Sequence, residues 1–243
     1  MKIALLGYGK MGKAIERQAL AKGHEIVLKI HSQNAADLIP DNLRHADVAI
    51  EFSKPETAFE NVATCLRSGV PVVVGTTAWL SQLPEAKRIC DEAGGAFLYA
   101  SNFSIGVNLF FALNRYLAAL MDNQPQYSAS MEEIHHAQKL DYPSGTAITL
   151  AEGILENTAR LTAWRGYLNE IQEAPSVDEI PILSKRIDPV PGTHTVTWAS
   201  EIDTIEIRHT ARSREGFAAG ALAAAEWLVG KKGCFEMKDM IGF

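Results

Sequence analysis

The sequence predicts an α/β fold in which a doubly wound parallel sheet is combined with an inserted α+β domain. In the first 30 residues an apolar run, a glycine-rich turn, a stretch with helical spacing and a second apolar run follow one another. Apolar runs and helical stretches then alternate to about residue 100, and near-continuous runs such as residues 70–74 are typical of parallel strands buried on both faces. Beyond residue 104, several strand-like runs accompany helical stretches expected on one face of a sheet, which favours a second, α+β domain.

The glycine-rich turn follows the first apolar run, residues 2–6, directly. Its glycines have separate roles: the first permits a tight turn, the second lets the backbone approach a pyrophosphate, and the third allows close packing of helix against strand. Because a strand precedes the turn and a helix and a second strand follow within about 30 residues, the motif predicts a Rossmann-type dinucleotide site. We expect the cofactor to bind at Gly7, Tyr8, Gly9, Lys10, Met11 and Gly12.

The end of the second strand lacks the usual ribose-binding carboxylate. In such sites an acidic residue about 20 residues beyond the glycines accepts from the adenosine ribose hydroxyls. Here the chain reads His31-Ser32-Gln33, with no Asp, Glu or Arg. We expect His31 to occupy the ribose position, and Ser32 can donate a hydrogen bond to a hydroxyl or a phosphate. The choice between NADH and NADPH therefore stays open.

Two further loops follow apolar strands of the same predicted sheet. We expect strands at 47–52, 71–74 and 96–100, with helices at 53–68 and 79–93 between them. Ligands of parallel sheets bind at the carboxyl ends of the strands, so these loops should gather with the glycine turn around one crevice. Ordinary turn chemistry is the alternative. The additional cofactor residues predicted in this way are Gly75, Thr76, Thr77, Ala100, Ser101, Asn102 and Phe103.

Composition sets limits on the class of protein. The 243 residues are 47% hydrophobic and 21% charged, which is ordinary for a globular protein. A net charge of −6 argues against nucleic acid as the main partner. Cys65, Cys90 and Cys234 show no paired spacing, which suggests reduced thiols and a cytoplasmic protein. The N-terminus runs straight into the first strand, so we expect no signal peptide, and no apolar run reaches the roughly 20 residues that span a membrane.

We expect residues 1–103, completed by residues 214–243, to form the dinucleotide-binding domain, and residues 104–213 to form the substrate-binding domain. A helix at 106–122 should lead into the second domain, with its leucines and aromatics in the core. Strands are expected at 126–134, 184–187, 194–199 and 204–210, a helix at 145–160 and a loop at 175–181. A helix at 217–229 should return to cover the first sheet.

Proton donors and cations are crowded between residues 132 and 147. Successive residues of a strand point to opposite faces, so His135 and His136 can line one pocket only if the chain turns there. Pro143-Ser144-Gly145 is typical of such a turn, and Ser144 is a candidate N-cap of the following helix.

The unpaired backbone N–H groups of a helix start favour a carboxylate or phosphate. His136 and Lys139 should add positive potential, and His135 is suited to proton transfer near neutral pH. A surface histidine pair before a capped helix is the alternative. A metal site formed by Glu132, His135 and His136 matches no standard zinc spacing, so we expect no metal.

The same segment resembles the signature of the bacterial dihydrodipicolinate reductase family, which acts on 4-hydroxy-tetrahydrodipicolinate. The signature reads Glu133-x-His135-His136-x-x-Lys139-x-Asp141-x-Pro143-Ser144-Gly145-Thr146-Ala147. The resemblance extends nearly end to end, through the glycine turn, Gly75-Thr76-Thr77, Asn102-Phe103-Ser104-Ile105-Gly106-Val107-Asn108 and Ser213-Arg214 with Phe217.

The resemblance implies hydride transfer from NADH or NADPH to a cyclic dicarboxylate imine in diaminopimelate and lysine biosynthesis. It implies that His135 is a proton donor or acceptor and Lys139 the proton donor. His136, Ser144, Gly145 and Thr146 would bind the substrate, and Arg214 would approach the cofactor. It also implies a homotetramer assembled through the sheets of the substrate domain. His31 departs from the acidic residue often found in the family.

Two other functions are compatible with the first half of the chain. One is a different Rossmann oxidoreductase that acts on an amino acid or a sugar. The other is a non-catalytic NAD(P)-binding redox sensor. The segment around His135 counts against both, because proton donors crowded beside a predicted cofactor crevice favour catalysis on a small anion.

Overall fold

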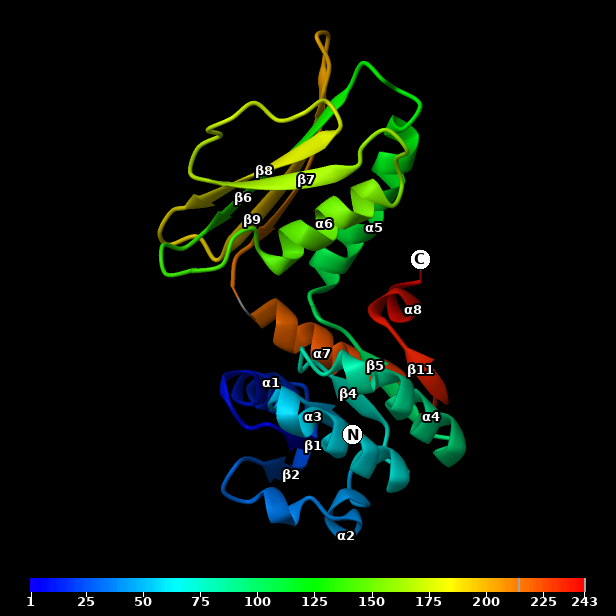
Figure 1. The fold of residues 1–243 in the computed structure, drawn as a ribbon. Coiled ribbons are helices and arrows are strands. Elements are labelled where there is room, and N and C mark those ends of the chain that lie inside the picture. The colour runs from blue at the N-terminus through cyan, green and yellow to red at the C-terminus, as the bar shows by residue number, and fades with distance from the viewer. Residues whose placement is uncertain (214, 243) are drawn as a thin grey trace. The chain divides into compact units, whose positions relative to one another are not determined.

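The computed structural model describes residues 1–213 and 215–242, and the chain divides into two compact units (Figure 1). Unit 1 comprises Met1–Ile105 and Glu215–Phe243, and unit 2 comprises Gly106–Arg214. No helix among the described residues is long and apolar enough to cross a membrane.

Unit 1 is built on a six-stranded parallel sheet with the order β11-β5-β4-β3-β1-β2. The strands are β1 (Lys2–Leu6), β2 (Glu25–Ile30), β3 (Val48–Glu51), β4 (Val72–Val74), β5 (Ala96–Tyr99) and β11 (Gly233–Phe235). Because the strands are parallel, their carboxyl ends lie along one edge. The predicted doubly wound parallel sheet is confirmed.

Helices cover both faces of this sheet because alternate strand residues point to opposite sides. Ile3, Leu5 and Ile50 pack in one core with α1 (Lys10–Ala21) and α7 (Glu215–Leu228). Ala4 and Leu6 pack in a second core with α3 (Pro55–Arg67) and α4 (Leu83–Ala93). The shorter helices of the unit are η1 (Ala35–Asp37), α2 (Pro40–Leu43), η2 (Leu80–Gln82) and α8 (Met237–Ile241).

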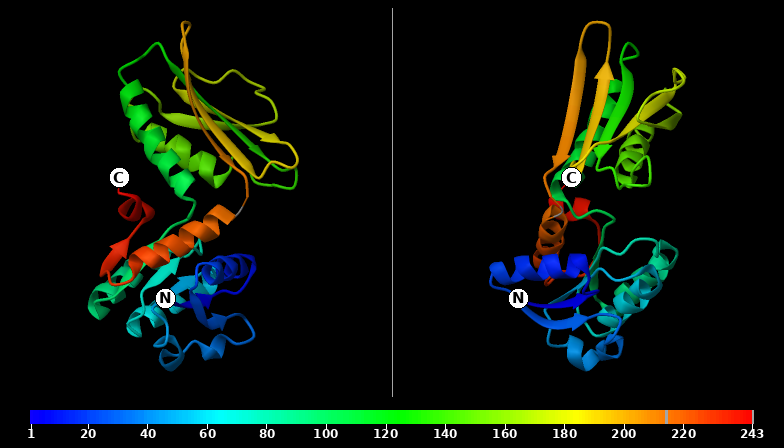
Figure 2. Two further views of the ribbon diagram at one scale, coloured as in Figure 1. Left: turned by 180° about the vertical axis from the view of Figure 1, so that it is seen from behind. Right: turned by 90° about the vertical axis from the view of Figure 1, so that its left-hand side faces the viewer.

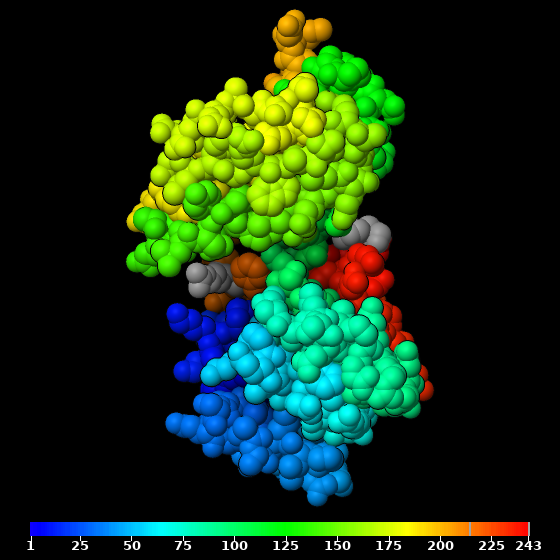
Figure 3. Space-filling model, viewed as in Figure 1, coloured from blue at the N-terminus to red at the C-terminus, as the bar shows by residue number. Residues whose placement is uncertain are grey.

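Unit 2 contains a mixed five-stranded sheet with the order β10-β9-β6-β8-β7. The strands are β6 (Ser128–His135), β7 (Ala163–Leu168), β8 (Glu179–Arg186), β9 (Gly192–Ala199) and β10 (Thr204–Ala211). One face packs against α5 (Ile105–Met121) and α6 (Gly145–Leu155) in a third core (Figure 2). The hairpin between β9 and β10 projects from this unit (Figure 3). Its turn, residues 200–203, contains the exposed Ile202.

Several predicted boundaries were wrong. β7 was not predicted, α6 ends at Leu155 rather than near residue 160, and β8 begins at Glu179 inside the segment predicted to be a loop. The predicted core helix α5 is only half buried. Leu109, Leu113 and Leu120 are about half exposed, whereas Phe110 and Leu117 pack in the core. Only one side of a helix can pack against a sheet, so leucines distributed around the whole helix cannot all be core residues.

Candidate active site

The glycine turn of unit 1 brings backbone against backbone. Gly7 has a φ of +95°, and a Cβ atom there would lie 2.1 Å from the carbonyl oxygen of Phe52. A Cβ atom on Gly12 would lie 2.5 Å from the carbonyl oxygen of Gly7. At Gly9, which directly precedes α1, a Cβ atom would meet nothing within 4 Å. The turn is therefore packed tightly on its inner side and open at the start of α1, where unpaired N–H groups favour a phosphate.

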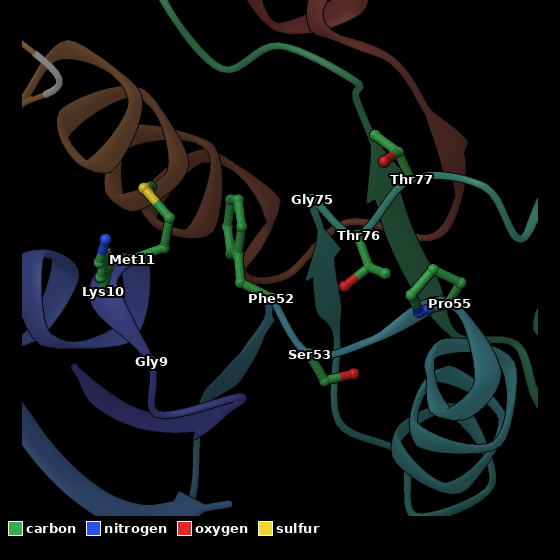
Figure 4. Close-up of a pocket in the computed structure, with 9 residues that line it drawn as sticks. All are labelled: Gly9, Lys10, Met11, Phe52, Ser53, Pro55, Gly75, Thr76 and Thr77. Atoms are coloured by element: carbon green, nitrogen blue, oxygen red, sulfur yellow. The ribbon is translucent and has the colours of Figure 1, made fainter. Parts of the chain in front are cut away.

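A cavity of about 500 Å³ lies beside the start of α1 (Figure 4). It brings together loops that follow β1, β3 and β4, as expected for carboxyl ends of neighbouring parallel strands. Its walls are formed by Gly9, Lys10, Met11, Phe52, Ser53, Pro55, Gly75, Thr76 and Thr77. A Cβ atom on Gly75 would lie 2.2 Å from the Phe52 ring, so a side chain there would displace the ring.

A second cavity of about 520 Å³ extends from the glycine turn to the end of β2. Its lining includes His31 and Ser32, which were expected at the ribose position, and Lys54, which precedes α3. No lining residue carries a carboxylate. The nearby Glu51 is fully buried, and its Oε1 accepts from the backbone N–H and the hydroxyl of Ser53. Sequence reasoning missed Lys54, because its approach to β2 depends on the strand order.

The remaining predicted cofactor residues lie elsewhere in unit 1 or outside the described residues. Ala100 and Phe103 belong to the core beside α7, and the ring of Phe103 lies 5.6 Å from that of Phe52. Ser101 is exposed, and Asn102 Oδ1 accepts from the backbone N–H of Ser104. These four residues follow β5 but do not line either cavity. Arg214 lies outside the described residues.

In unit 2 the helix-facing side of the sheet changes from apolar to polar along its strands. Met131 pairs with Val196, Glu133 pairs with His194 on the same side, and Arg186 pairs with His135 at the end of the row. Glu133, His135 and His194 are all buried. His135 is the last residue of β6, so His136 lies beyond the strand, and its side chain need not point to the opposite face of the sheet.

Glu133 is the centre of this polar row. Both carboxylate oxygens accept from the backbone N–H of Ser144 at 3.1 Å, and Nε2 of His194 lies 3.5 Å from Oε2. Burial raises the pKa of Glu133, but hydrogen bonds from His194 and Ser144 outweigh it and lower the pKa to about 2. Glu133 is therefore ionised at neutral pH.

His135 is held in its neutral form. Its Nδ1 atom lies 3.6 Å from Glu133 Oε2, and its ring lies edge-on to that of His194 at 5.1 Å. Burial lowers the pKa of His135, and the positive charges of Lys139 and Arg186 lower it further. The negative charge of Glu133 raises it by less than burial lowers it, so the pKa is about 4. A neutral imidazole can accept a proton. It is protonated near neutral pH, and can then donate that proton, only if an added negative charge raises its pKa.

The loop that carries Lys139 is fixed by side chains from β8 and beyond. Arg186 donates to the carbonyl oxygens of Lys139 at 3.1 Å and Asp141 at 2.7 Å. Asp188 accepts from the backbone N–H of Ala137 at 2.9 Å. Nζ of Lys139 pairs with Asp141 at 2.7 Å, and this contact lowers the pKa of Asp141. The predictions omitted Arg186 and His194; strand register alone brings them beside Glu133.

The start of α6 offers a site for an anion. Ser144 is the N-cap, as predicted, and its hydroxyl accepts from the backbone N–H of Ala147 at 3.2 Å. The same hydroxyl lies 3.0 Å from His194 Nε2. Gly145 is exposed, and a Cβ atom on it would meet nothing within 4 Å. The backbone N–H groups of Gly145 and Thr146 can therefore meet a carboxylate.

The grouping of Glu132 with His135 and His136, considered for a metal, does not form. Glu132 points to the opposite side of β6 from His135 and pairs with Lys185 at 2.5 Å. Instead Glu133, His135 and His194 bring ligand-type atoms within 4.8 Å of one another. Arg186 Nη2 lies 3.6 Å from the same carboxylate, and a fixed cation there opposes a metal ion.

Comparison with known proteins accounts for both units. The N-terminal model of dihydrodipicolinate reductase matches residues 1–103, and the C-terminal model of the same enzyme matches residues 106–241. The chain belongs to the dihydrodipicolinate reductase family. The resemblance seen in the sequence is thereby confirmed, and the chain is an oxidoreductase that uses a nicotinamide cofactor. The open glycine turn and the two cavities beside it fit such a cofactor.

Individual relatives agree over nearly the whole length. The 4-hydroxy-tetrahydrodipicolinate reductase of Christiangramia forsetii is 53% identical over 99% of this chain and 98% of its own. The enzyme of that name from Methanopyrus kandleri is 37% identical over 84% of this chain and 74% of its own. A dipicolinate-bound dihydrodipicolinate reductase from Paenisporosarcina sp. TG-14 has the same fold, with a TM-score of 0.77, 24% identity and 97% of both chains covered.

Proposed function

We propose that this chain reduces 4-hydroxy-tetrahydrodipicolinate to tetrahydrodipicolinate with NADPH or NADH, in diaminopimelate and lysine biosynthesis. One observation carries the proposal: His135, Lys139 and the open start of α6 belong to one short segment that is fixed by Glu133 and Arg186. Such a segment combines proton-handling groups with donors for carboxylates. The relatives' shared name points to the same substrate.

The substrate has two carboxylates that need fixed donors. We assign their binding to His136, Ser144, Gly145 and Thr146. The backbone N–H groups at the start of α6 are already oriented, so little reorganisation accompanies binding. His136 is half-buried beyond the end of β6, where its ring can reach a ligand.

The reaction needs one hydride and one proton. When bound, a nicotinamide would supply the hydride. The 4-hydroxyl group leaves as water with a proton from the adjacent ring carbon, which forms the conjugated imine without net uptake of a proton. Hydride addition to a conjugated imine leaves electrons on a neighbouring atom, which must then receive a proton. We assign this proton to Lys139 Nζ, with His135 as the partner that accepts or returns protons. The negative charge of a bound dicarboxylate would favour protonated His135, opposing the effect of burial.

We further propose that NADPH is preferred over NADH. The cavity that includes His31 and Ser32 has Lys54 on its wall and no carboxylate. A carboxylate would accept from the ribose hydroxyls of NADH and repel a 2′-phosphate, whereas an ammonium and two hydrogen-bonding side chains suit the phosphate. The other cofactor contacts are assigned to the Gly7–Gly12 turn and to Gly75–Thr77, which border the two cavities. Ala100–Phe103, which line neither cavity, and Arg214 are assigned to the cofactor from the family resemblance alone.

We also propose a cytoplasmic homotetramer assembled through the unit 2 sheet. The face of this sheet that points away from α5 and α6 holds a shallow cavity of about 290 Å³, with Ser130, Thr195 and Thr197 on its wall. Light scattering coupled to size-exclusion chromatography tests this: a mass of four chains supports it, and a monomer overturns it.

The decisive experiment follows NADPH and NADH oxidation at 340 nm while the substrate is generated enzymatically in the cuvette. We expect oxidation that depends on the generated substrate and is faster with NADPH at limiting cofactor. A panel of amino acids and sugars serves as the control. Absence of oxidation above the blank, or equal turnover on a panel member, would overturn the proposal.

A further inference from the structure

Glu133 is fully buried, and it has no direct role in the hydride transfer or the substrate binding proposed above. It lies in the middle of the polar row, with Ser184 opposite it on β8 and His194 opposite it on β9. A buried, ionised carboxylate is costly unless several donors satisfy it. Its position in this row therefore needs a reason beyond packing, since an apolar residue would continue the core of Met131.

The carboxylate contacts two parts of the proposed site at once. It accepts from the backbone N–H of Ser144, the N-cap of α6, through both oxygens at 3.1 Å. Its Oε2 also lies 3.6 Å from His135 Nδ1, a buried atom that has no hydrogen-bond partner among the described residues. One side chain thus touches both the proton-handling ring and the start of the anion-binding helix.

We propose that Glu133 is a positioning residue: its carboxylate orients the His135 imidazole through Nδ1 and fixes the Ser144 N–H at the start of α6, so that both keep one geometry. The inference rests on the function proposed above. A carboxylate presents only acceptors, so it selects the form of the neutral ring that carries its proton on Nδ1. Nε2 is then the atom left to exchange a proton with the substrate.

The opposite edge of the His135 ring is kept open by the neighbouring strand. A Cβ atom on Gly192 would lie 3.2 Å from His135 Nε2 and 3.4 Å from its Cδ2. The side chain of His135 is 11% exposed although Nδ1 is buried, so the exposed part lies away from Glu133. The ring therefore has a buried edge facing a carboxylate and a second edge left uncovered by a glycine.

The charges around His135 come from four segments. Glu133 is on its own strand, Arg186 on β8, His194 on β9 and Lys139 on the following loop. Glu133 is the single anion among them, so its removal should lower the pKa of His135. A metal ion shared by Glu133, His135 and His194 is the competing explanation of the cluster, and Arg186 at 3.6 Å from Glu133 argues against it.

The test compares Glu133→Gln with Glu156→Gln, the same change at the exposed end of α6, where Glu156 lies 3.7 Å from Arg115. We expect Glu133→Gln to lower kcat/KM for the substrate by about tenfold or more, with an unchanged KM for NADPH. In the pH profile of kcat/KM, the limb that reports protonation of His135 should move to lower pH. Glu133→Asp keeps the charge and should leave that limb near its wild-type position, and Glu156→Gln should behave as wild type.

A role limited to folding would lower activity at every pH without moving the limb, and that result would overturn the inference. Because Glu133→Gln can fail to fold, the tautomer of His135 is measured separately in wild-type protein labelled with ¹³C-histidine, with His135→Asn to assign the signal. A proton on Nδ1 supports the inference, and a proton on Nε2 overturns it. Activity of wild-type protein that is lost on metal chelation would also overturn it. Wild-type protein without reductase activity would instead refute the proposed function.

Discussion

The two units build their proposed ligand sites from different parts of the chain. Unit 1 uses backbone: Gly7 and Gly12 pack against carbonyl oxygens at 2.1 and 2.5 Å from where a Cβ atom would lie. Unit 2 uses side chains: Glu133, Arg186 and His194 from three strands hold the segment that carries His135 and Lys139. A cofactor common to many enzymes can be bound by backbone geometry alone, whereas a particular reaction requires charged side chains at defined positions. Substitutions in the two sites should therefore have different effects: loss of stability and cofactor binding in unit 1, and loss of turnover in unit 2.

Lys139→Met should have the largest effect on activity. Loss of the proposed proton donor should lower kcat by roughly 10²- to 10⁴-fold, while the affinity for NADPH and the folding of unit 2 remain unchanged. Lys87→Met is the control, because that exposed lysine is on α4 of unit 1, outside the residues assigned to either ligand. Steady-state kinetics and NADPH titration provide the measurement. Near-normal turnover would remove Lys139 from its assigned role.

Gly7→Ala should damage unit 1 through structure. The new Cβ atom would displace the Phe52 carbonyl group, and the φ of +95° adds strain, so we expect a loss of about 3 kcal/mol in unfolding free energy and weaker NADPH binding. Gly23→Ala is the control: its φ is +79°, but a Cβ atom there meets nothing within 4 Å. Urea unfolding of both variants separates the steric contact with the Phe52 carbonyl group, present only at Gly7, from the backbone strain of a positive φ, present at both positions. Equal stability losses would show that the tight turn is not what the site depends on.

The stability of unit 2 should depend on pH through His135. The folded state holds this histidine neutral, with a pKa of about 4 against 6.5 unfolded, so the unfolded chain binds more protons between these values. Stability should therefore fall as pH drops from 6.5 to 4, and His135→Asn should reduce that fall by about 2 kcal/mol. Glu133, with a pKa of about 2, adds a further fall from pH 4.5 to 2. His45→Asn, at an exposed histidine, is the control for urea unfolding across this range. Parallel stability curves for His135→Asn and wild type would contradict the buried neutral ring.

Lys54→Met should have a smaller effect, confined to cofactor choice. Because Lys54 is exposed, its attraction to a 2′-phosphate is partly screened, and we expect the ratio of kcat/KM for NADPH to that for NADH to fall roughly five- to tenfold. Lys87→Met, on α4, should leave the ratio unchanged. An unchanged ratio in Lys54→Met would show that the phosphate is recognised elsewhere.

The contrast between the units also explains what the sequence could predict. The glycine turn could be found because its function resides in backbone geometry, which glycine spacing reports directly. The N-cap Ser144 could be found for the same reason, because a cap is local. Arg186 and His194 lie 53 and 61 residues beyond Glu133 in the sequence and reach it only through the register of β8 and β9. No local pattern reports such a register.

Short and half-buried elements were missed for a related physical reason. β11 has three residues and completes the unit 1 sheet only because β5 offers an edge. β7 carries Trp164, Arg165 and Gly166, whose mixed polarity hides a strand at the end of the sheet. Gly166 itself packs beneath Pro143, since a Cβ atom there would lie 2.6 Å from that ring. These features become visible only when the partner strand or loop is in place.

The most direct test of the division between the two sites is a pair of calorimetric titrations of His136→Ala, one with NADPH and one with dipicolinate. His136 is assigned to the substrate alone, so we predict an unchanged dissociation constant for NADPH and a dissociation constant for dipicolinate that rises roughly fivefold, as expected for the loss of one hydrogen bond. Unchanged dipicolinate binding, or an equal loss for both ligands, would contradict the account.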